Sequence, residues 1–295
     1  MMVGLAICAF YELIWVAESE AWYGAFVASA ALPAYMALFL AKGGAARTSP
    51  RLIPVQIVAI IGAAVAAYPL FDRNPVSETQ VWPLAAAVLS VLGLQWYVFV
   101  YSRYGRKKSG AIVAGRPLPD LAFEALDGAR VRTSDFIGSK TLLVFFRGNW
   151  CPLCMGQLRE VRARADRLEA AGVKVKFISN QSPERSRELA LKLALPDHFE
   201  ILHDRELRAA KSLAIEDIGG APPGLKDFPA DTVMATVIGL DAEGRVIYGD
   251  ETDNYRVRPH PDSFLPVFEA PNTERTPQRS PNVIASIKTE TMMDT

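Results

Sequence analysis

TLLVFFRGNWCPLC occupies residues 141–154 of the chain. Its first part, Thr141 to Phe146, consists of apolar, β-branched and aromatic side chains with one threonine at its start, which predicts a buried strand. From Pro152 to Ala171 apolar residues recur at helical spacing among Arg and Glu, which predicts a long amphipathic helix. Cys151 and Cys154 therefore stand where a buried strand gives way to the first turn of a helix.

This position favours an ionised thiol. The unpaired N–H groups and the dipole of a helix N-terminus stabilise an anion, so we expect the pKa of Cys151 to fall and its thiolate to attack at neutral pH. Pro152 fits the first helical turn, where its missing N–H would be unpaired anyway. Cys154, one turn further on, is within reach to close a disulfide after Cys151 has reacted. Arg147 adds positive potential near the thiolate, and Trp150 is the residue of the motif that directly precedes Cys151.

Other roles for two cysteines have less support. A structural zinc site needs about four ligands, but the third cysteine, Cys8, is distant in sequence and the three histidines, His198, His203 and His260, form no matching pair. We therefore expect no metal and no bound cofactor. A structural disulfide is disfavoured by the reducing compartment expected below. Two inert core cysteines would leave their placement at a helix start unexplained.

The sequence on either side of this motif predicts an α/β domain. We expect further strands over residues 173–178, 199–202, 232–240 and 245–248, and further helices over residues 183–194, 206–214 and 262–269. The last two strands flank the turn sequence DAEG, which is typical of a β-hairpin. Strands that alternate with helices and end in a hairpin indicate a mixed sheet with helices on both faces.

Charge is distributed unevenly along the chain. The 295 residues include 32 Lys+Arg and 32 Asp+Glu. With a net charge of zero, the chain lacks the excess of basic residues that nucleic-acid-binding domains have, so we expect no nucleic acid partner. Nine of the charged residues lie at or before Ser102 and 55 lie after it. This segregation indicates a membrane region followed by a water-soluble domain.

Three segments before Ser102 are long enough to cross a bilayer as helices, which takes about 20 apolar residues. They are Trp22–Ala41, Leu52–Phe71 and Val81–Tyr101, and none contains Lys, Arg, Asp or Glu. A fourth segment, Val3–Ala17, is shorter, and whether it spans is left open. We expect an all-α transmembrane bundle of three to four spans, with the lipid bilayer as its partner.

Basic residues predict the orientation of this bundle. Two clusters are separated by two spans and so share one side of the membrane: Lys42, Arg47 and Arg51, then Arg103, Arg106, Lys107 and Lys108. Positive charge resists translocation, so this side is expected to be cytoplasmic. The prediction is a multi-pass protein of the cell (inner) membrane with its soluble domain in the cytoplasm.

The chain is therefore predicted to have four parts. Residues 1–102 form the transmembrane helical region, 103–114 a basic linker, and 115–270 the soluble α/β domain. Residues 271–295 are rich in Pro, Thr, Ser and Asn and are expected to be a disordered tail.

The cysteine motif resembles that of a known family. RGNWCPLC, residues 147–154, is similar to the R-G-x-W-C-P-x-C signature of peroxiredoxin-like proteins in the alkyl hydroperoxide reductase/thiol-specific antioxidant group. GRPLPDLAF, residues 115–123, and the following Asp127-Gly128 resemble the G-x-x-x-P-D-F…D-G start of that group. The resemblance extends over about Gly115–Ala270 and implies a thioredoxin-like fold and an oxidoreductase.

The resemblance also implies a reaction. Cys151 would attack a hydroperoxide and become a sulfenic acid, which would condense with Cys154 to a disulfide. An external thiol would then reduce that disulfide. Thiol–disulfide exchange through the same two residues is the alternative activity. A redox sensor or assembly module of a membrane complex is the alternative from another class.

Two departures keep the choice between the two activities open. Peroxiredoxins carry a P-x-x-x-T-x-x-C motif, and counting back from Cys151 gives Val144 and Gly148 at the proline and threonine positions. Thioredoxin-like reductases usually place a cis-proline before the hairpin strand, where this chain has Val233–Thr236.

One further segment has two open interpretations. TDNYRVRP, residues 252–259, is dense in polar and aromatic side chains. It is interpreted either as a lining of the groove near the dithiol or as a solvated connector.

Overall fold

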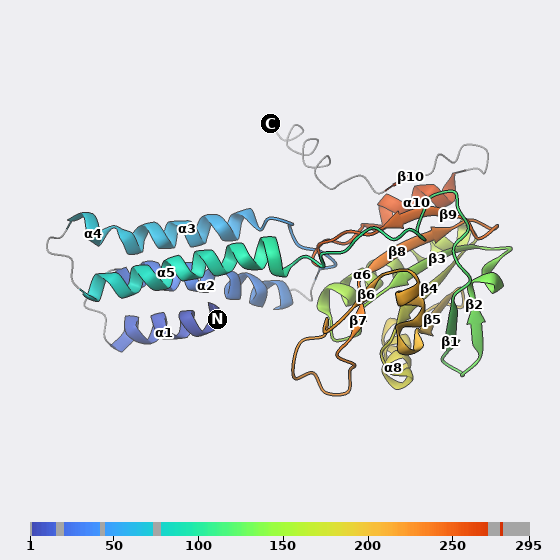
Figure 1. Ribbon diagram of the computed structural model, residues 1–295, viewed down its shortest axis with the longest axis horizontal. Coiled ribbons are helices and arrows are strands. Elements are labelled where there is room, and N and C mark those ends of the chain that lie inside the picture. Colours follow the sequence, from blue (N-terminus) through green and yellow to red (C-terminus); the bar gives the residue numbers. More distant parts are fainter. Residues whose placement is uncertain (1, 16–20, 42–44, 73–77, 271–277, 280–295) are drawn as a thin grey trace. The chain divides into compact units, whose positions relative to one another are not determined.

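The computed structural model describes residues 2–15, 21–41, 45–72, 78–270 and 278–279. It contains two compact units, Met1–Arg103 and Tyr104–Thr295. Figure 1 shows the helices of the first unit in blue to cyan and the sheet of the second in green to red.

In its described residues the first unit is helical. Its elements are α1 (Met2–Trp15), α2 (Ala21–Ala41), α3 (Ile53–Ala67), α4 (Pro69–Asp72), α5 (Glu78–Trp96) and the π-helical turn η1 (Tyr97–Tyr101). The helices α1, α2, α3 and α5 pack against one another as a bundle.

Three helical segments of this unit are long and apolar enough to cross a membrane, namely Ala21–Ala41, Ile53–Phe71 and Val81–Tyr101. They coincide with the three segments expected from the sequence. The 14-residue α1 is shorter than the roughly 20 residues that a span requires. Some apolar side chains point away from the bundle. Ile61, for example, is 55% exposed. Insertion into a bilayer stays a prediction.

Small residues allow α2 and α3 to approach closely. A Cβ atom added at Gly62 would lie 2.5 Å from the backbone nitrogen of Ala28, and one added at Gly24 would collide with the backbone of Ala66. A side chain at either position would therefore force the two helix backbones apart. Close approach of this kind is how helices associate where burial from water gives little driving force.

Replacing Gly62 with alanine is expected to destabilise the bundle. The added methyl group meets backbone atoms, which cannot rotate away, so we expect a loss of at least about 1–3 kcal/mol in the free energy of unfolding. The matched control is Gly4→Ala in α1, because nothing lies within 4 Å of a Cβ at Gly4. That change should be neutral or stabilise the helix by up to about 1 kcal/mol. Thermal unfolding of the detergent-solubilised chain, followed by circular dichroism, measures both; equal melting temperatures would contradict the close α2–α3 contact.

The second unit is built on a mixed sheet with the strand order β10-β9-β8-β3-β4-β5-β1-β2. Strands β3, β4 and β5 are parallel to one another, whereas β8 is antiparallel to β3 and β9 is antiparallel to β8. The strands are β1 (Ala122–Ala125), β2 (Arg130–Arg132), β3 (Lys140–Phe145), β4 (Val173–Ser179), β5 (Phe199–His203), β8 (Thr236–Leu240), β9 (Val246–Asp250) and β10 (Gln278–Arg279). A separate two-stranded sheet consists of β6 (Glu216–Asp217) and β7 (Thr232–Val233).

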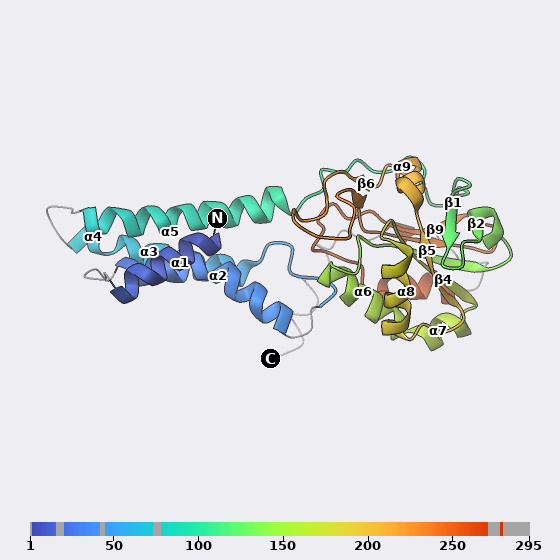
Figure 2. The ribbon, with the colours of Figure 1, turned by 90° about the horizontal axis from the view of Figure 1, so that it is seen from below.

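Helices cover both faces of the main sheet. They are α6 (Pro152–Arg162), α7 (Ala165–Ala170), α8 (Pro183–Leu193), α9 (Arg208–Ser212) and α10 (Pro261–Glu269), with the 3-10 turns η2 (Thr133–Phe136) and η3 (Arg205–Leu207). Figure 2 shows α6, α7 and α8 on one face and α9 on the other. Right-handed crossovers between the parallel strands β3, β4 and β5 place α6, α7 and α8 on one face, and α9 lies on the connection that returns the chain to β8. The predicted mixed sheet with helices on both faces, in the thioredoxin-like arrangement, is confirmed.

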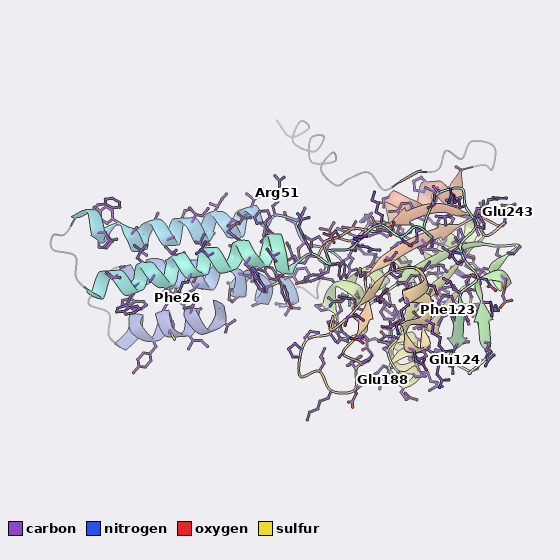
Figure 3. All side chains as sticks on the ribbon, in the orientation of Figure 1. Phe26, Arg51, Phe123, Glu124, Glu188 and Glu243 are labelled. Carbon is purple, nitrogen blue, oxygen red and sulfur yellow. The ribbon has the colours of Figure 1, made fainter. Side chains whose placement is uncertain are left out.

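Alternating side chains of the central strands fill the core. Leu143 and Phe145 of β3 point to the same side and join Ile178 of β4, Phe123 of β1 and Leu213 after α9 in one buried cluster. Phe123 of β1 is buried, Glu124 beside it is half-buried, and Glu188 and Glu243 are exposed (Figure 3). The cluster anchors β3, and with it the chain segment that leads to the two cysteines.

Several expected elements differ from those observed. The predicted helix 152–171 is divided into α6 and α7 at Ala163–Arg164, where Arg164 leaves helical geometry. The predicted strand 232–240 is divided into β7 and β8, because β7 leaves the main sheet to pair with β6. Strands β1, β2 and β6 were not foreseen. The predicted disordered tail, 271–295, lies outside the described residues except for β10, which pairs with β9.

Candidate active site

A tight loop brings the chain from β3 into α6. After Phe146, whose N–H bonds to the carbonyl of Ile178, the chain turns so that the N–H of Cys151 donates to the carbonyl of Gly148 at 3.1 Å. Gly148 has a φ of +146°, and an added Cβ would lie 2.6 Å from Nε1 of Trp150. A glycine is therefore required here, both for the backbone angle and for the tryptophan beside it.

The two cysteines lie where the sequence placed them, at the start of α6. Cys151 is the N-cap residue, with extended backbone angles, and Pro152 follows at the first helical position. Cys154 lies one turn further along the helix. Both cysteines are unpaired thiols. Cys151 is 3% exposed and Cys154 is 0% exposed, so the dithiol is almost closed to solvent.

The pKa of each thiol depends on the other. The hydrogen bond between the sulfurs and burial raise the pKa of Cys151 well above its usual value. Burial opposes ionisation of Cys154, but the hydrogen bond from Cys151 and the positive charge of Arg258 outweigh it and lower the pKa of Cys154 to about 6. The expectation of a lowered pKa at Cys151 is therefore wrong. Its physical reason is that the hydrogen bond to Cys154 and burial keep the proton on Cys151, whereas the positive charge of Arg258 lies beside Cys154.

Arg258, which follows Cys154 by 104 residues in the sequence, supplies that charge. Its Nη2 atom lies 3.7 Å from Sγ of Cys154, and the residue is 4% exposed. Arg258 also hydrogen-bonds to the hydroxyl of Tyr104, which in turn accepts the N–H of Ala235 at 3.2 Å. Burial raises the pKa of Tyr104, so its phenol stays neutral. The arginine is thus fixed between a buried phenol and a buried sulfur.

Arg147 is held in a different way. Its Nη2 atom lies 3.2 Å from Oδ2 of Asp217 and also donates to the carbonyl of Gly220. Three aromatic rings surround its guanidinium, with centroids 5.1 to 6.0 Å from Cζ: Trp150, Tyr255 and Tyr104. Cation–π contacts of this kind stabilise a desolvated guanidinium. Arg147 adds positive potential to both thiols, as expected, while its side chain ties the β6 segment to the site.

The three supporting residues expected from the sequence, Arg147, Trp150 and Pro152, therefore have different roles. Arg147 and Trp150 pack against each other beside the dithiol. Pro152 is exposed on the first turn of α6 and contributes backbone geometry rather than a contact.

Sequence reasoning missed Tyr104 and Arg258. Tyr104 lies in the segment interpreted as a linker, where the N–H groups of Tyr104 and Arg106 bond to Asp253 and that of Ser109 bonds to Glu251. Arg258 lies in the polar segment 252–259, for which a lining of the dithiol site was one of two interpretations. The density of aromatic and basic residues in that segment was the one available signal.

Metal ligands do not gather around the dithiol. Among the residues that the structure describes, no three His, Cys, Asp or Glu side chains are placed to hold a metal ion. Of the histidines, Nδ1 of His203 lies 2.9 Å from the carbonyl of Gln181 and Nε2 of His198 lies 3.2 Å from that of Ala165.

Comparison with known proteins gives this domain its family. Residues 114–248 match the AhpC/TSA family. Over 161 residues, 54% of this chain and 93% of the relative, the chain is 28% identical to peroxiredoxin Bcp of Escherichia coli K12.

Two solved structures are similar to this chain over about half of its length. Peroxidoxin BcpB from Mycobacterium tuberculosis matches 55% of this chain and 97% of its own, with 16% identity and a TM-score of 0.44. Reduced Prx3 from Vibrio vulnificus, solved with H2O2, matches 53% and 99%, with 19% identity and a TM-score of 0.46. On the strength of the family match and its own topology, the part of the chain over residues 114–248 is a peroxiredoxin-like oxidoreductase domain of the AhpC/TSA family.

Proposed function

We propose that the protein is a membrane-anchored, thiol-dependent hydroperoxide reductase that uses the Cys151/Cys154 dithiol. The family match and the similarity to peroxiredoxin Bcp support the reaction class. The three long apolar helices support the anchor.

The observation that carries this proposal is the burial of both cysteines of the dithiol. Cys151 is 3% exposed and Cys154 is 0% exposed. A hydroperoxide presents two oxygen atoms at the end of a molecule and needs only a narrow opening to reach a sulfur. A protein disulfide must bring a second polypeptide against the same sulfur. The closed site therefore favours a small substrate.

The reaction transfers two electrons. A thiolate attacks the outer oxygen of the hydroperoxide, the O–O bond breaks, and an alcohol leaves after taking up a proton. The sulfenic acid that forms condenses with the second thiol to give a disulfide and water. The disulfide needs two electrons and two protons from an external thiol before the next turnover.

Thiol–disulfide exchange is the second candidate, because two cysteines two residues apart at a helix start are the arrangement that such exchange uses. In that reaction Cys151 would attack a substrate disulfide and Cys154 would release it. The backbone beside the site gives thiol–disulfide exchange less support than the cysteine spacing does. The N–H of Ala235 donates to Tyr104, and its carbonyl accepts from Nη1 of Arg106 at 3.4 Å. These groups are therefore occupied and do not offer a strand edge to an incoming peptide.

Peroxide is expected to oxidise the reduced full-length chain in detergent at least about a hundredfold faster than a free cysteine at the same pH, a typical gain from positioned charge. Stopped-flow fluorescence measures this, since Trp150 lies beside the dithiol. The Cys151→Ser/Cys154→Ser double variant is the control and should show no fast phase.

A different result would change the assigned function. Slow reaction with peroxide together with rapid reduction of insulin would select thiol–disulfide exchange. Slow reaction with both, combined with a reversible dithiol titration, would indicate a redox sensor or assembly module.

We further propose that the protein resides in the cell (inner) membrane with its redoxin domain on the cytoplasmic side. The basic clusters that include Arg47, Arg51 and Lys107 support this side. Protease added to inverted membrane vesicles should remove the domain, whereas protease added to right-side-out vesicles should leave it intact. The opposite pattern would reverse the orientation.

A further inference from the structure

A long hairpin arm belongs to the small two-stranded sheet. Residues 216–233 form it, and they comprise β6, β7 and the connection between these strands. The pairing continues past the strands, because the N–H of Ala221 donates to the carbonyl of Ala230 at 3.0 Å. The residues between this pair, 222–229, form the tip of the hairpin arm and are mostly exposed. Figure 1 shows the hairpin arm in orange between the labels of β6 and β7.

Arg147 binds the base of the hairpin arm to the segment that leads to Cys151. Its Nη2 atom lies 3.2 Å from Oδ2 of Asp217 and donates to the carbonyl of Gly220. Its own carbonyl accepts the hydroxyl of Thr232 at 2.7 Å, so both strands of the hairpin arm are bound to one residue. The side chains of Arg147 and Asp217 are 10% and 19% exposed. Water screens such a partly buried ion pair less than a surface pair, so the contact holds the base in place.

Gly220 allows the hairpin arm to fold back over Asp217. A Cβ atom added at Gly220 would collide with the carboxylate of Asp217 and would lie 2.7 Å from Cγ2 of Thr232. A side chain at this position would therefore displace the carboxylate that binds Arg147.

Asn180 and Arg185 hold the hairpin arm at two further points. Nδ2 of Asn180, which follows β4, donates to the carbonyl of Asp231 at 2.8 Å. At the tip, Nη2 of Arg185 in α8 lies 3.4 Å from Oδ2 of Asp227, and the guanidinium lies 5.5 Å from the centroid of the Phe228 ring. The tip is therefore bound to α8, whereas the base is bound to the segment that follows β3.

The same elements hold the segment between Arg147 and Cys151. Asn149 lies in this segment, and its Nδ2 atom donates to the carbonyl of Arg185 at 3.4 Å. Its N–H donates to Oε1 of Gln181, in the turn before α8, at 2.8 Å. The hairpin arm and the segment that leads to the dithiol thus share their contacts with α8 and with the turn before it. The hairpin arm runs along this segment, from Arg147 to α8.

We propose that the hairpin arm determines the specificity of the dithiol by admitting small molecules and excluding polypeptides, and that Arg147 is the positioning residue that holds it closed. This inference rests on the proposed hydroperoxide reductase activity and adds the class of its reductant. None of the contacts named above involves a cysteine sulfur, so formation of the Cys151–Cys154 disulfide leaves them in place. The hairpin arm therefore closes the oxidised site as well, and the external reductant is a low-molecular-weight thiol.

Reduction by a small thiol takes two steps. A small thiolate attacks one sulfur of the Cys151–Cys154 disulfide, the S–S bond breaks, and a mixed disulfide forms while the other cysteine leaves and takes up a proton. A second small thiolate attacks the small-molecule sulfur of the mixed disulfide, and the remaining cysteine leaves and takes up a proton. Two electrons pass to the chain, and the two small thiols depart as their own disulfide. A polypeptide dithiol would have to place its backbone against the sulfur, where the hairpin arm lies.

Two maleimides of different size measure access to the dithiol without any redox substrate. N-ethylmaleimide and a polyethylene glycol maleimide the size of a small protein share one reactive group. The reduced full-length chain is used in detergent with Cys8→Ser, because Cys8 is exposed and would also react. Relative to free cysteine, we expect the large maleimide to be disfavoured over the small one by at least about a hundredfold, since it requires local opening. Equal access for the two maleimides would overturn the inference.

Asp217→Asn removes the charge that Arg147 binds and leaves Arg147 beside the dithiol. It should accelerate the large maleimide at least about tenfold, the effect of losing a charged hydrogen bond, and change the rate of N-ethylmaleimide by less than about threefold. The matched control is Glu269→Gln, which removes an ion pair with Arg167 at 2.8 Å and should change neither rate. Circular dichroism melting confirms that each variant is folded. No increase, or an equal increase for both reagents, would contradict the role of Arg147.

A shortened hairpin arm gives a second test that leaves the ion pair at the base intact. Replacing residues 222–229 with Asn-Gly joins Ala221 to Ala230 through a two-residue turn, which suits a hairpin whose last pair is already hydrogen-bonded. The replacement removes the contacts of the tip with Arg185. The large maleimide should again react at least about tenfold faster. An unchanged rate in this variant, once it is shown to be folded, would exclude the tip from control of access.

Reduction of the oxidised chain distinguishes the two classes of reductant. Diamide forms the disulfide, so no peroxidase activity is required, and the fluorescence of Trp150 beside the dithiol follows its reduction. Reduced thioredoxin should act on the wild-type chain no faster than glutathione. With the shortened hairpin arm, thioredoxin should become at least about tenfold faster, and glutathione should change by less than about threefold. Rapid reduction of the wild-type chain by thioredoxin would refute the assignment of a small thiol.

These measurements can fail independently of the proposed function. A chain that excludes the large maleimide and thioredoxin but does not react with peroxide would uphold the role of the hairpin arm and refute the hydroperoxide reductase. A chain that reacts rapidly with peroxide and admits both maleimides equally would uphold the reductase and refute the role of the hairpin arm.

Discussion

The contact between a buried guanidinium and a buried sulfur sets the constraint on which the rest of the domain depends. Arg258 and Cys154 lie 3.7 Å apart and are 4% and 0% exposed. Neither charge would be tolerated alone at this depth, because desolvation costs several kcal/mol per ion. Together, and with the hydrogen bond from Cys151, they allow a thiolate in the interior. The dithiol is thus part of an electrostatic unit whose other half lies 104 residues further along the chain.

The segments on either side of the family-matched region hold this unit in place. The Arg106 side chain pairs with Glu251 at 3.5 Å, and the N–H of Tyr104 bonds to the carbonyl of Asp253 at 2.8 Å. These contacts align the segment before the sheet with the one that carries Arg258. A fragment that begins at residue 115 lacks Tyr104 and Arg106, so it lacks the hydrogen bond from Arg258 to Tyr104 and the contacts of both residues with Glu251 and Asp253. The segment interpreted as a linker is a structural part of the site.

Sequence patterns predicted the sheet and the position of the dithiol, because both depend on local periodicity. The alternation in residues 173–178 and the apolar run before Phe146 correspond to β4 and β3. The charge on the dithiol depends on a distant residue, and a rule for helix N-termini selected Cys151 instead.

The same ion pair has a consequence for the oxidised state. When Cys151 and Cys154 form a disulfide, the negative charge beside Arg258 disappears, and its favourable interaction with the buried guanidinium is lost. That loss falls on the oxidised form alone, so it shifts the equilibrium toward the dithiol. Stabilising the reduced form raises a reduction potential, by about 30 mV for each 1.4 kcal/mol in a two-electron couple. The arrangement that activates the thiolate therefore also makes the disulfide easier for an external thiol to reduce, and both effects favour turnover.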